Sequence, residues 1–280
     1  MKYQIRKMNR KDLGIAVEWA AKEGWNPGLY DADAFYETDP NGFFMGFLDD
    51  EPISSISAVS YGNGFGFLGF YIVKPAYRDK GYGILVWDAA LMYLKNHTIG
   101  LDGVVAQQEN YKKSNFKLAY RNIRYEGFGS GVKTKSDTIV PLSTVQFEEI
   151  LAYDKKLFPA TRTPFLSLWL KQPESLALGY VEKGKLIGYG MIRKCRTGYK
   201  VGPLFADNAK IADALFSELK AFVDTKSTVY LDVPEINTAA IKLAERYHMK
   251  PMFETARMYT EKPPEVDLNK VFGVTTFELG

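Results

Sequence analysis

The order in which strand-like and helix-like patterns follow one another constrains this fold more than any other feature of the sequence. Residues 1–130 predict a strand, two helices, three strands, a helix, a strand, a short helix and a strand. Alternating apolar and polar residues predict the strands, and apolar residues spaced three and four apart predict the helices. A similar order begins again near residue 137 and continues to residue 280. This repeat predicts a duplicated architecture with two tandem domains, 1–130 and 137–280.

Each half is expected to be an α+β (mixed α/β) domain, in which helices flank a mixed, mostly antiparallel sheet. The stretch "GSGVKTKSD", residues 129–137, is rich in Gly, Ser and Lys and predicts the linker between the halves.

The composition excludes several classes of protein. The formal net charge is +3, which is too small to indicate a nucleic-acid-binding protein. The N-terminus lacks the apolar core of a secretory signal, and no apolar run is long enough to span a membrane. Cys195 is the only cysteine, so an intramolecular disulfide is excluded and a cytoplasmic location is expected. Two His and one Cys, widely spaced, give no metal-ligand pattern. A monomer or a homodimer is expected.

The stretch "VKPAYRDKGYG", residues 73–83, leaves a predicted strand and precedes a predicted helix. Unpaired N–H groups and the helix dipole favour anions at such a helix start. Gly81 and Gly83 would let the backbone approach a phosphate closely, because glycine has no Cβ. Arg78 and Lys80 add charged hydrogen-bond donors. These residues therefore predict a pyrophosphate-binding loop.

Two other phosphate-binding motifs do not fit. The loop has no Gly-Lys-Ser/Thr, so it is not a Walker motif. The glycines at 64, 66 and 69 spell Gly-x-Gly-x-x-Gly, but the segment continues as a strand where a dinucleotide-binding motif would open a helix.

The run Arg78-Asp79-Lys80-Gly81-Tyr82-Gly83, between "GFYIVKPAY" and "ILVWDAALMYL", resembles the signature of the GNAT (GCN5-related N-acetyltransferase) family. The resemblance implies that these six residues hold the pyrophosphate of acetyl-CoA as cosubstrate. It also implies that a backbone N–H near Ile72 or Val73, on a splayed fourth strand, polarises the thioester carbonyl.

A second segment, "NYKKSNF" at 110–116, resembles the run at the fourth helix of the family. The resemblance makes Tyr111 the candidate general acid for the leaving thiolate. Asn115 replaces the usual glycine and also tolerates a left-handed conformation. The family often places a carboxylate on the fourth strand, but residues 61–73 contain none. The general base is therefore unknown, with Glu109 as a weak candidate and Tyr71 and Tyr120 as further ones.

The second half resembles the same family without its phosphate loop. Its fourth strand, "GYKVGPLF", leads into "ADNAKIADALF", which has no Gly-x-Gly and only one basic residue. The segment "NTAAIKLAERYHM" keeps the pattern of the fourth helix. The chain is thus identified as a tandem GNAT protein with a degenerate C-terminal domain, which would shape the acceptor site or stabilise the first domain. Trp25 and Tyr30 lie in the loop that borders the acceptor site in this family.

The resemblance implies an acyltransferase that transfers an acetyl group from acetyl-CoA to a primary amine, expected to be that of a small molecule. A non-catalytic acyl-CoA-binding or sensing protein is the alternative, because the strand carboxylate is missing and the second half is degenerate. Fold alone does not decide between them.

Overall fold

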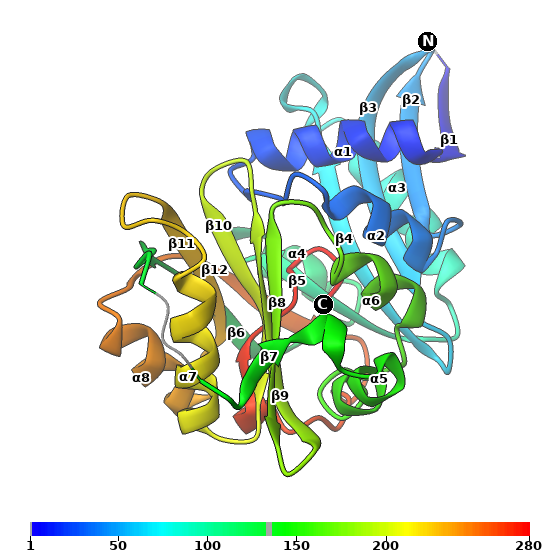
Figure 1. Ribbon diagram of the computed structural model, residues 1–280. Helices are drawn as coiled ribbons and strands as arrows, with labels where there is room; N and C mark the ends of the chain where they lie inside the picture. The colour runs from blue at the N-terminus through cyan, green and yellow to red at the C-terminus, as the bar shows by residue number, and fades with distance from the viewer. Residues whose placement is uncertain (1, 133–135) are drawn as a thin grey trace.

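A computed structural model describes residues 2–132 and 136–280, which form one continuous 13-stranded sheet with helices on both faces (Figure 1). The predicted linker includes residues 133–135, which lie outside the described residues. The domain boundaries at 130 and 137 stay a prediction.

The first half contains, in chain order, the elements expected from the sequence. They are β1 (Tyr3–Lys7), α1 (Arg10–Lys22), α2 (Asp31–Thr38), β2 (Phe43–Leu48), β3 (Glu51–Ser60), β4 (Phe65–Val73), α3 (Tyr82–Tyr93), β5 (Thr98–Val104), α4 (Gln108–Lys112) and β6 (Lys117–Phe128).

The second half repeats the order and adds a short last strand. Its elements are β7 (Ile139–Pro141), α5 (Phe147–Asp154), α6 (Thr163–Trp169), β8 (Ser175–Glu182), β9 (Lys185–Lys194), β10 (Tyr199–Ala206), α7 (Ala209–Lys220), β11 (Thr228–Pro234), α8 (Thr238–Arg246), β12 (Lys250–Tyr259) and β13 (Val271–Gly273). In the described residues β4–β5 and β10–β11 pair in parallel and the other neighbours are antiparallel, which confirms the predicted fold class.

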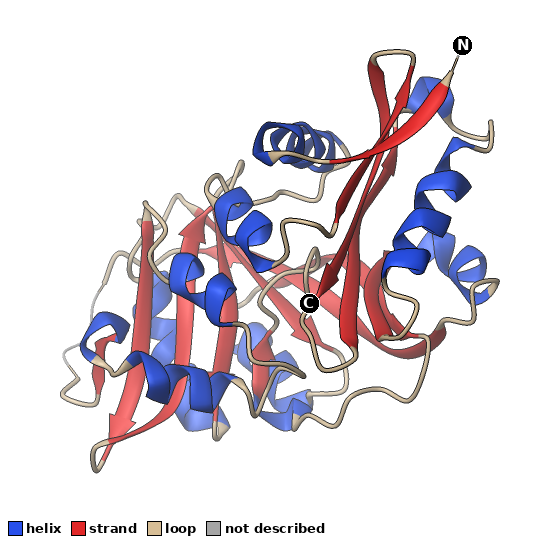
Figure 2. Ribbon diagram, turned by 90° about the vertical axis from the view of Figure 1, so that its right-hand side faces the viewer, coloured by secondary structure: helices blue, strands red, loops and turns tan. Residues whose placement is uncertain are grey.

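Alternation of side chains along the strands supplies cores on both faces of the sheet. In β2, Phe43 and Met45 belong to the core under α1, α2 and α6, whereas Phe44 belongs to the core under α3 and α4. Successive strand residues point to opposite faces, so a run of apolar residues serves both layers. Figure 2 shows the helices on the two sides of the strands.

The two halves exchange their long C-terminal strands. The order along the sheet is β5-β12-β6-β11, so β12 of the second half lies between β5 and β6 of the first. β6 in turn pairs with β11 of the second half over its register from Asn122 to Phe128. Neither half therefore contains its complete sheet, and the backbone hydrogen bonds of each depend on the other.

A buried ion pair lies at this exchange. Asp102 of β5 accepts hydrogen bonds from Arg257 of β12, at 2.9 Å to Nε and 2.6 Å to Nη2. It also accepts one from Asn122 of β6 at 2.8 Å. Charge-assisted bidentate pairs of this kind are the strong ones, and this one joins three adjacent strands.

Both parallel strand pairs separate before their ends. β4 pairs with β5 only from Phe65 to Leu68, and β10 pairs with β11 only from Tyr199 to Val201. Beyond Val201 the gap is filled by β13, which pairs with β10 at Leu204 and Phe205. The C-terminus then ends in the middle of the molecule, between the two halves (Figure 1).

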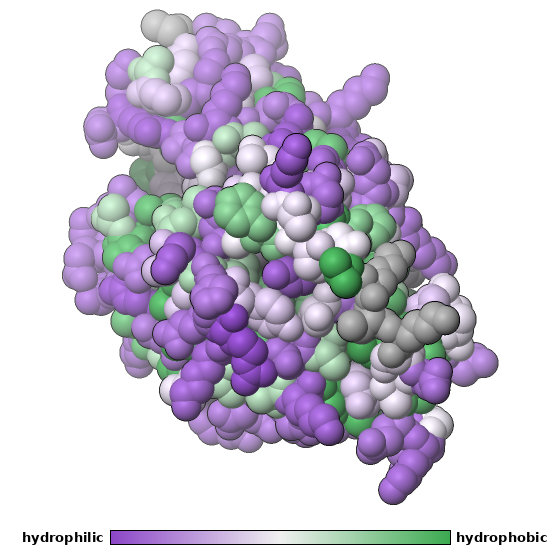
Figure 3. Space-filling model, turned by 60° about the vertical axis from the view of Figure 1, so that its left-hand side comes forward, coloured by the Kyte–Doolittle hydropathy of each residue, from purple (hydrophilic) through white to green (hydrophobic). Residues whose placement is uncertain are grey.

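The surface seen in Figure 3 is mainly hydrophilic, with hydrophobic residues scattered in small groups. No helix in the described parts of the chain is both long and apolar enough to cross a membrane.

We expect Asp102→Ala to lower the free energy of unfolding by about 3 to 5 kcal/mol, because it leaves the buried Arg257 guanidinium without its carboxylate. Urea unfolding followed by circular dichroism measures the change. Glu109→Ala is the matched control, since it removes an exposed pair with Lys112 and should cost less than about 1 kcal/mol. Equal effects of the two substitutions would contradict the importance of the pair at the exchange.

Candidate active site

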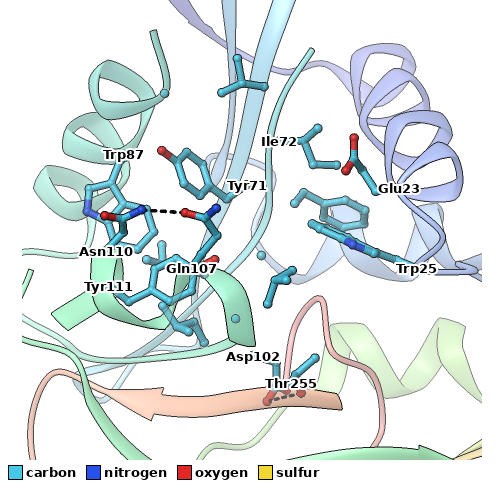
Figure 4. A pocket seen from close by; sticks show the side chains of 18 of the residues that line it. Glu23, Trp25, Tyr71, Ile72, Trp87, Asp102, Gln107, Asn110, Tyr111 and Thr255 are labelled. Atoms are coloured by element: carbon cyan, nitrogen blue, oxygen red, sulfur yellow. Dashed lines mark hydrogen bonds between the residues drawn. The ribbon is translucent and has the colours of Figure 1, made fainter. Parts of the chain in front are cut away.

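A cavity of about 460 Å³ opens where β4 and β5 separate. Its walls come from the C-terminal end of α1, from β4 and the loop after it, from α3 and α4, from β12 and from the C-terminal tail. In Figure 4, Trp87, Tyr111 and Gln107 lie on one side, Trp25 and Glu23 on the other, and Asp102 and Thr255 at the base. The cavity is therefore built by both halves of the chain.

The loop after β4 leaves a helix start without a side-chain cap. Gly81 is the N-cap of α3 with φ of 83°, a conformation that favours glycine, and no side chain caps the first turn. A Cβ on Gly83 would lie 2.7 Å from Tyr71 Oη and 3.2 Å from a methyl carbon of Val73, so this approach also requires glycine. The first turn of α3 thus has no side-chain acceptor for its N–H groups, and Gly81 and Gly83 line the cavity, which is an arrangement that an anion site requires.

The basic residues of the loop differ in their positions. Arg78 lines the cavity, donates to the Val73 carbonyl at 2.9 Å and forms an ion pair with Glu23 at the end of α1. Lys80 instead folds back to donate to the Ala76 carbonyl at 2.9 Å. An anion at the helix start would compete with Glu23 for the Arg78 guanidinium.

Of the other residues expected at the cofactor, four line the cavity and one does not. Those that line it are Ile72, Val73, Asp79 and Gly83. The ring of Tyr82 instead packs against Tyr3, with centroids 5.1 Å apart.

The inner part of β4 is irregular at the cavity. Phe70 has φ of 47°, and the register between β3 and β4 shifts beside it. Because β5 pairs with β4 no further than Leu68, the following β4 backbone leaves its partner strand at the cavity wall. This is the strand segment that was expected to polarise a carbonyl.

Tyr111 is buried at the cavity wall. Its ring stacks on Trp87, with centroids 5.6 Å apart and planes 24° apart. Burial, and then the nearby Tyr71, raise the pKa of Tyr111 to about 12, while a backbone hydrogen bond at Val104 opposes the shift. The phenol therefore keeps its proton at neutral pH. Asn115, at the end of this segment, has φ of 65°, the left-handed conformation expected for it.

The candidates for a base have different surroundings. Glu109 does not line the cavity: its side chain is 79% exposed and pairs with Lys112. Tyr120 is buried beside Arg257, and burial raises its pKa far above the usual value. Tyr71 lines the cavity, and its pKa is raised by burial and then by the charge of Asp88.

The loop between α1 and α2 is held by hydrogen bonds to β6 of the first half and to residues of the second half. Trp25 lines the cavity, and its carbonyl accepts a hydrogen bond from Arg124 of β6 at 2.9 Å. Asn26 exchanges two hydrogen bonds with Thr197, each at 2.9 Å. Tyr30 lies outside the cavity and donates to Glu174 at 2.8 Å.

Four cavity residues from the second half were not predicted as site residues from the sequence. They are Phe253 and Thr255 of β12 and Phe277 and Glu278 of the tail. β12 reaches the cavity only through the strand exchange, and the tail has no periodic pattern, so a local reading of the sequence could not place either.

In the second half, the helix start and the strand gap that correspond to this cavity are occupied by groups of the protein itself. The side chain of Asn208 caps α7 by accepting from the N–H groups of Lys210 and Ile211, at 3.0 and 3.1 Å. A Cβ on Gly202 would lie 2.6 Å from the carbonyl oxygens of Val274 and Thr275 in the tail. The second helix start is therefore already satisfied, and the second strand gap already filled.

Comparisons with known proteins agree with this geometry. A model described as "Acetyltransferase (GNAT) family" matches residues 6–116, and one described as "Acetyltransferase (GNAT) domain" matches residues 150–273. A Pseudoalteromonas sp. protein named holothin acyltransferase is 31% identical over 266 residues, covering 95% of this chain and 90% of that protein. The chain therefore belongs to the GNAT family. It is an acyltransferase with two GNAT domains.

Two solved structures show the same fold. A Pyrococcus horikoshii protein named as a candidate acetyltransferase has a TM-score of 0.85 at 23% identity, covering 99% of this chain and 96% of its own. A tandem GNAT protein from the clavulanic acid biosynthesis pathway has a TM-score of 0.65 at 12% identity, covering 94% of this chain and 100% of its own. At these identities the likeness concerns the fold alone.

We expect Tyr111→Phe to reduce the loss of stability at high pH. An unfolded tyrosine ionises near pH 10, whereas the pKa of folded Tyr111 is about 12. Between these values the unfolded chain releases the proton and the folded chain keeps it, so wild-type stability falls as pH rises. The fall should exceed that of the variant by up to about 3 kcal/mol. Urea unfolding at a series of pH values measures this, and parallel curves for the two proteins would contradict the shift.

Proposed function

We propose that this acyltransferase transfers an acetyl group from acetyl-CoA to the primary amine of a small molecule, by direct attack of the amine on the thioester. The main support for this proposal is the cavity between the separated strands β4 and β5, with an uncapped helix start at its mouth. This site is present in the first half, whereas its counterpart in the second half is capped by Asn208 and filled by the tail.

The mouth of the cavity fits a pyrophosphate by its chemistry. The N–H groups after Gly81 would hold the phosphate oxygens, and the Arg78 guanidinium would add a charged donor. A side chain at position 83 would crowd Tyr71 and Val73 at the cavity wall.

The reaction needs an activated carbonyl, a base and an acid. A backbone N–H of β4 near Ile72 or Val73 would polarise the thioester carbonyl. The amine nitrogen would bond to the carbonyl carbon as the carbon–sulfur bond breaks, and Tyr111 would give its proton to the departing thiolate. Because the Tyr111 phenol is protonated at neutral pH, it is ready to donate.

The acceptor is proposed to lie against the second half, between Trp25 and the rings of Phe253 and Phe277. A pocket with aromatic walls favours a flat, largely apolar body that carries the amine. The name of the 31% identical relative gives holothin as its acceptor, which makes holothin the first acceptor to test here.

Binding can be tested by calorimetric titration with acetyl-CoA, with ATP as the control ligand. We expect Arg78→Ala to weaken acetyl-CoA binding by about 10-fold or more, the usual effect of losing a charge-assisted hydrogen bond. Glu23→Gln is the matched variant: it removes the carboxylate that pairs with Arg78, so binding should be unchanged or tighter. Equal affinity for ATP, or an Arg78→Ala variant that binds like wild type, would contradict the site.

Transfer can be tested by thiol release from acetyl-CoA in the presence of holothin and a panel of primary amines. We expect release with wild type, and a decrease of kcat by about 100-fold in Tyr111→Phe with acetyl-CoA affinity retained. If acetyl-CoA binds tightly but no acceptor stimulates thiol release, the protein is an acyl-CoA-binding or sensing protein instead.

A further inference from the structure

The C-terminal tail brings a carboxylate into the cavity that the sequence of β4 lacks. Glu278 lines the cavity and is 3% exposed. Its backbone lies directly on β4: a Cβ on Gly69 would be 2.0 Å from the Glu278 carbonyl oxygen. Any side chain at position 69 would displace the tail. The glycine at position 69 therefore allows the tail to lie against β4.

The residues on either side of Glu278 fix its direction. Phe277 packs in the core with Tyr189 and Phe205 of the second half. Leu279 packs in the core with Phe70 and Ile72 of the first half. The tail is therefore held at both neighbours of Glu278, by one half on each side, and Glu278 itself lines the cavity.

Backbone hydrogen bonds hold this end of the chain in one conformation. Tyr61 Oη donates to the Leu279 carbonyl at 2.8 Å, and the Gly280 N–H donates to the Thr276 carbonyl at 3.2 Å. The Thr276 hydroxyl donates to one carboxylate oxygen of Glu278. This bond engages one of the two carboxylate oxygens of a residue that lines the cavity, and we take the second oxygen as the one that faces a ligand.

Three buried cations lie within electrostatic range of Glu278. They are Arg124 of β6, Arg193 of β9 and Lys200 of β10. Arg124 and Arg193 have carboxylate partners of their own, Asp232 and Asp31. Glu278 lines the cavity, unlike these three cations. The Lys200 ammonium donates to the Asn26 carbonyl at 3.1 Å.

We propose that Glu278, supplied by the tail of the second half, is the general base that accepts the acceptor's proton at the cavity of the first half. This inference rests on the proposed function. As the amine nitrogen bonds to the thioester carbonyl carbon, its N–H proton passes to the free Glu278 oxygen. The carbon–sulfur bond breaks, and the thiolate takes the Tyr111 proton. The products are the acetylated amine and the free thiol, with Glu278 left protonated and Tyr111 left as the phenolate. Exchange of one proton with solvent at each group restores the enzyme, so atoms and charge balance.

The test measures thiol release from acetyl-CoA at saturating holothin, or at the best amine of the panel. Glu278→Gln should lower kcat by about 100-fold or more, the usual contribution of a general base, with acetyl-CoA affinity unchanged. Glu278→Asp keeps the charge but withdraws the carboxylate by one methylene, so its kcat should drop by less than that of Glu278→Gln.

Lys200→Met is the matched control, because it changes a neighbouring buried charge without touching the cavity. It should lower stability and leave kcat within a few-fold of the wild-type value. If Glu278→Gln keeps the wild-type kcat, or if Lys200→Met reproduces its loss to the same extent, Glu278 is a structural counter-ion and the inference is overturned. If wild type itself releases no thiol with any acceptor, the proposed function fails first, and the assignment of Glu278 falls with it. If the Gln variant does not fold, a Glu278→Asp protein with full kcat overturns the inference by itself.

Discussion

The exchange of β6 and β12 is the constraint on which the rest of this structure depends. Because β12 lies between β5 and β6, the sheet runs unbroken from one half to the other. The cavity at the end of the first half's parallel strands then receives walls from the second half, through Phe253 and Thr255 of β12. A tandem arrangement of two separate sheets would leave this side of the cavity to solvent.

The exchange also requires charged residues inside the sheet to be neutralised where they meet. Asp102 with Arg257, and Asp232 with Arg124, each join strands that come from different halves. A buried charge without its partner is costly, so these pairs penalise any register other than the observed one. Together with the backbone hydrogen bonds between the strands, these ion pairs determine the register in which the two halves pair.

Each half has a gap where its two parallel strands separate, and the two gaps differ in what fills them. The first half keeps an open gap beneath an uncapped helix, whereas the second half closes its gap with β13 and caps its helix with Asn208. The same segment that closes the second gap continues past Gly202 to Gly69 in the first half. The second half thus lacks the open gap and the uncapped helix start of the first half, and its tail lines the cavity of the first half.

The sequence by itself determined the order of the elements, the fold class and the loop around Gly81, because each is encoded by patterns within a few residues. It also placed Tyr111 beside the cavity through a local motif. Only the tertiary structure decided which strands are neighbours and where Glu278 lies. Strand pairing and the path of a non-periodic tail depend on contacts between residues more than a hundred positions apart, such as Tyr61 with Leu279, and no local pattern records them.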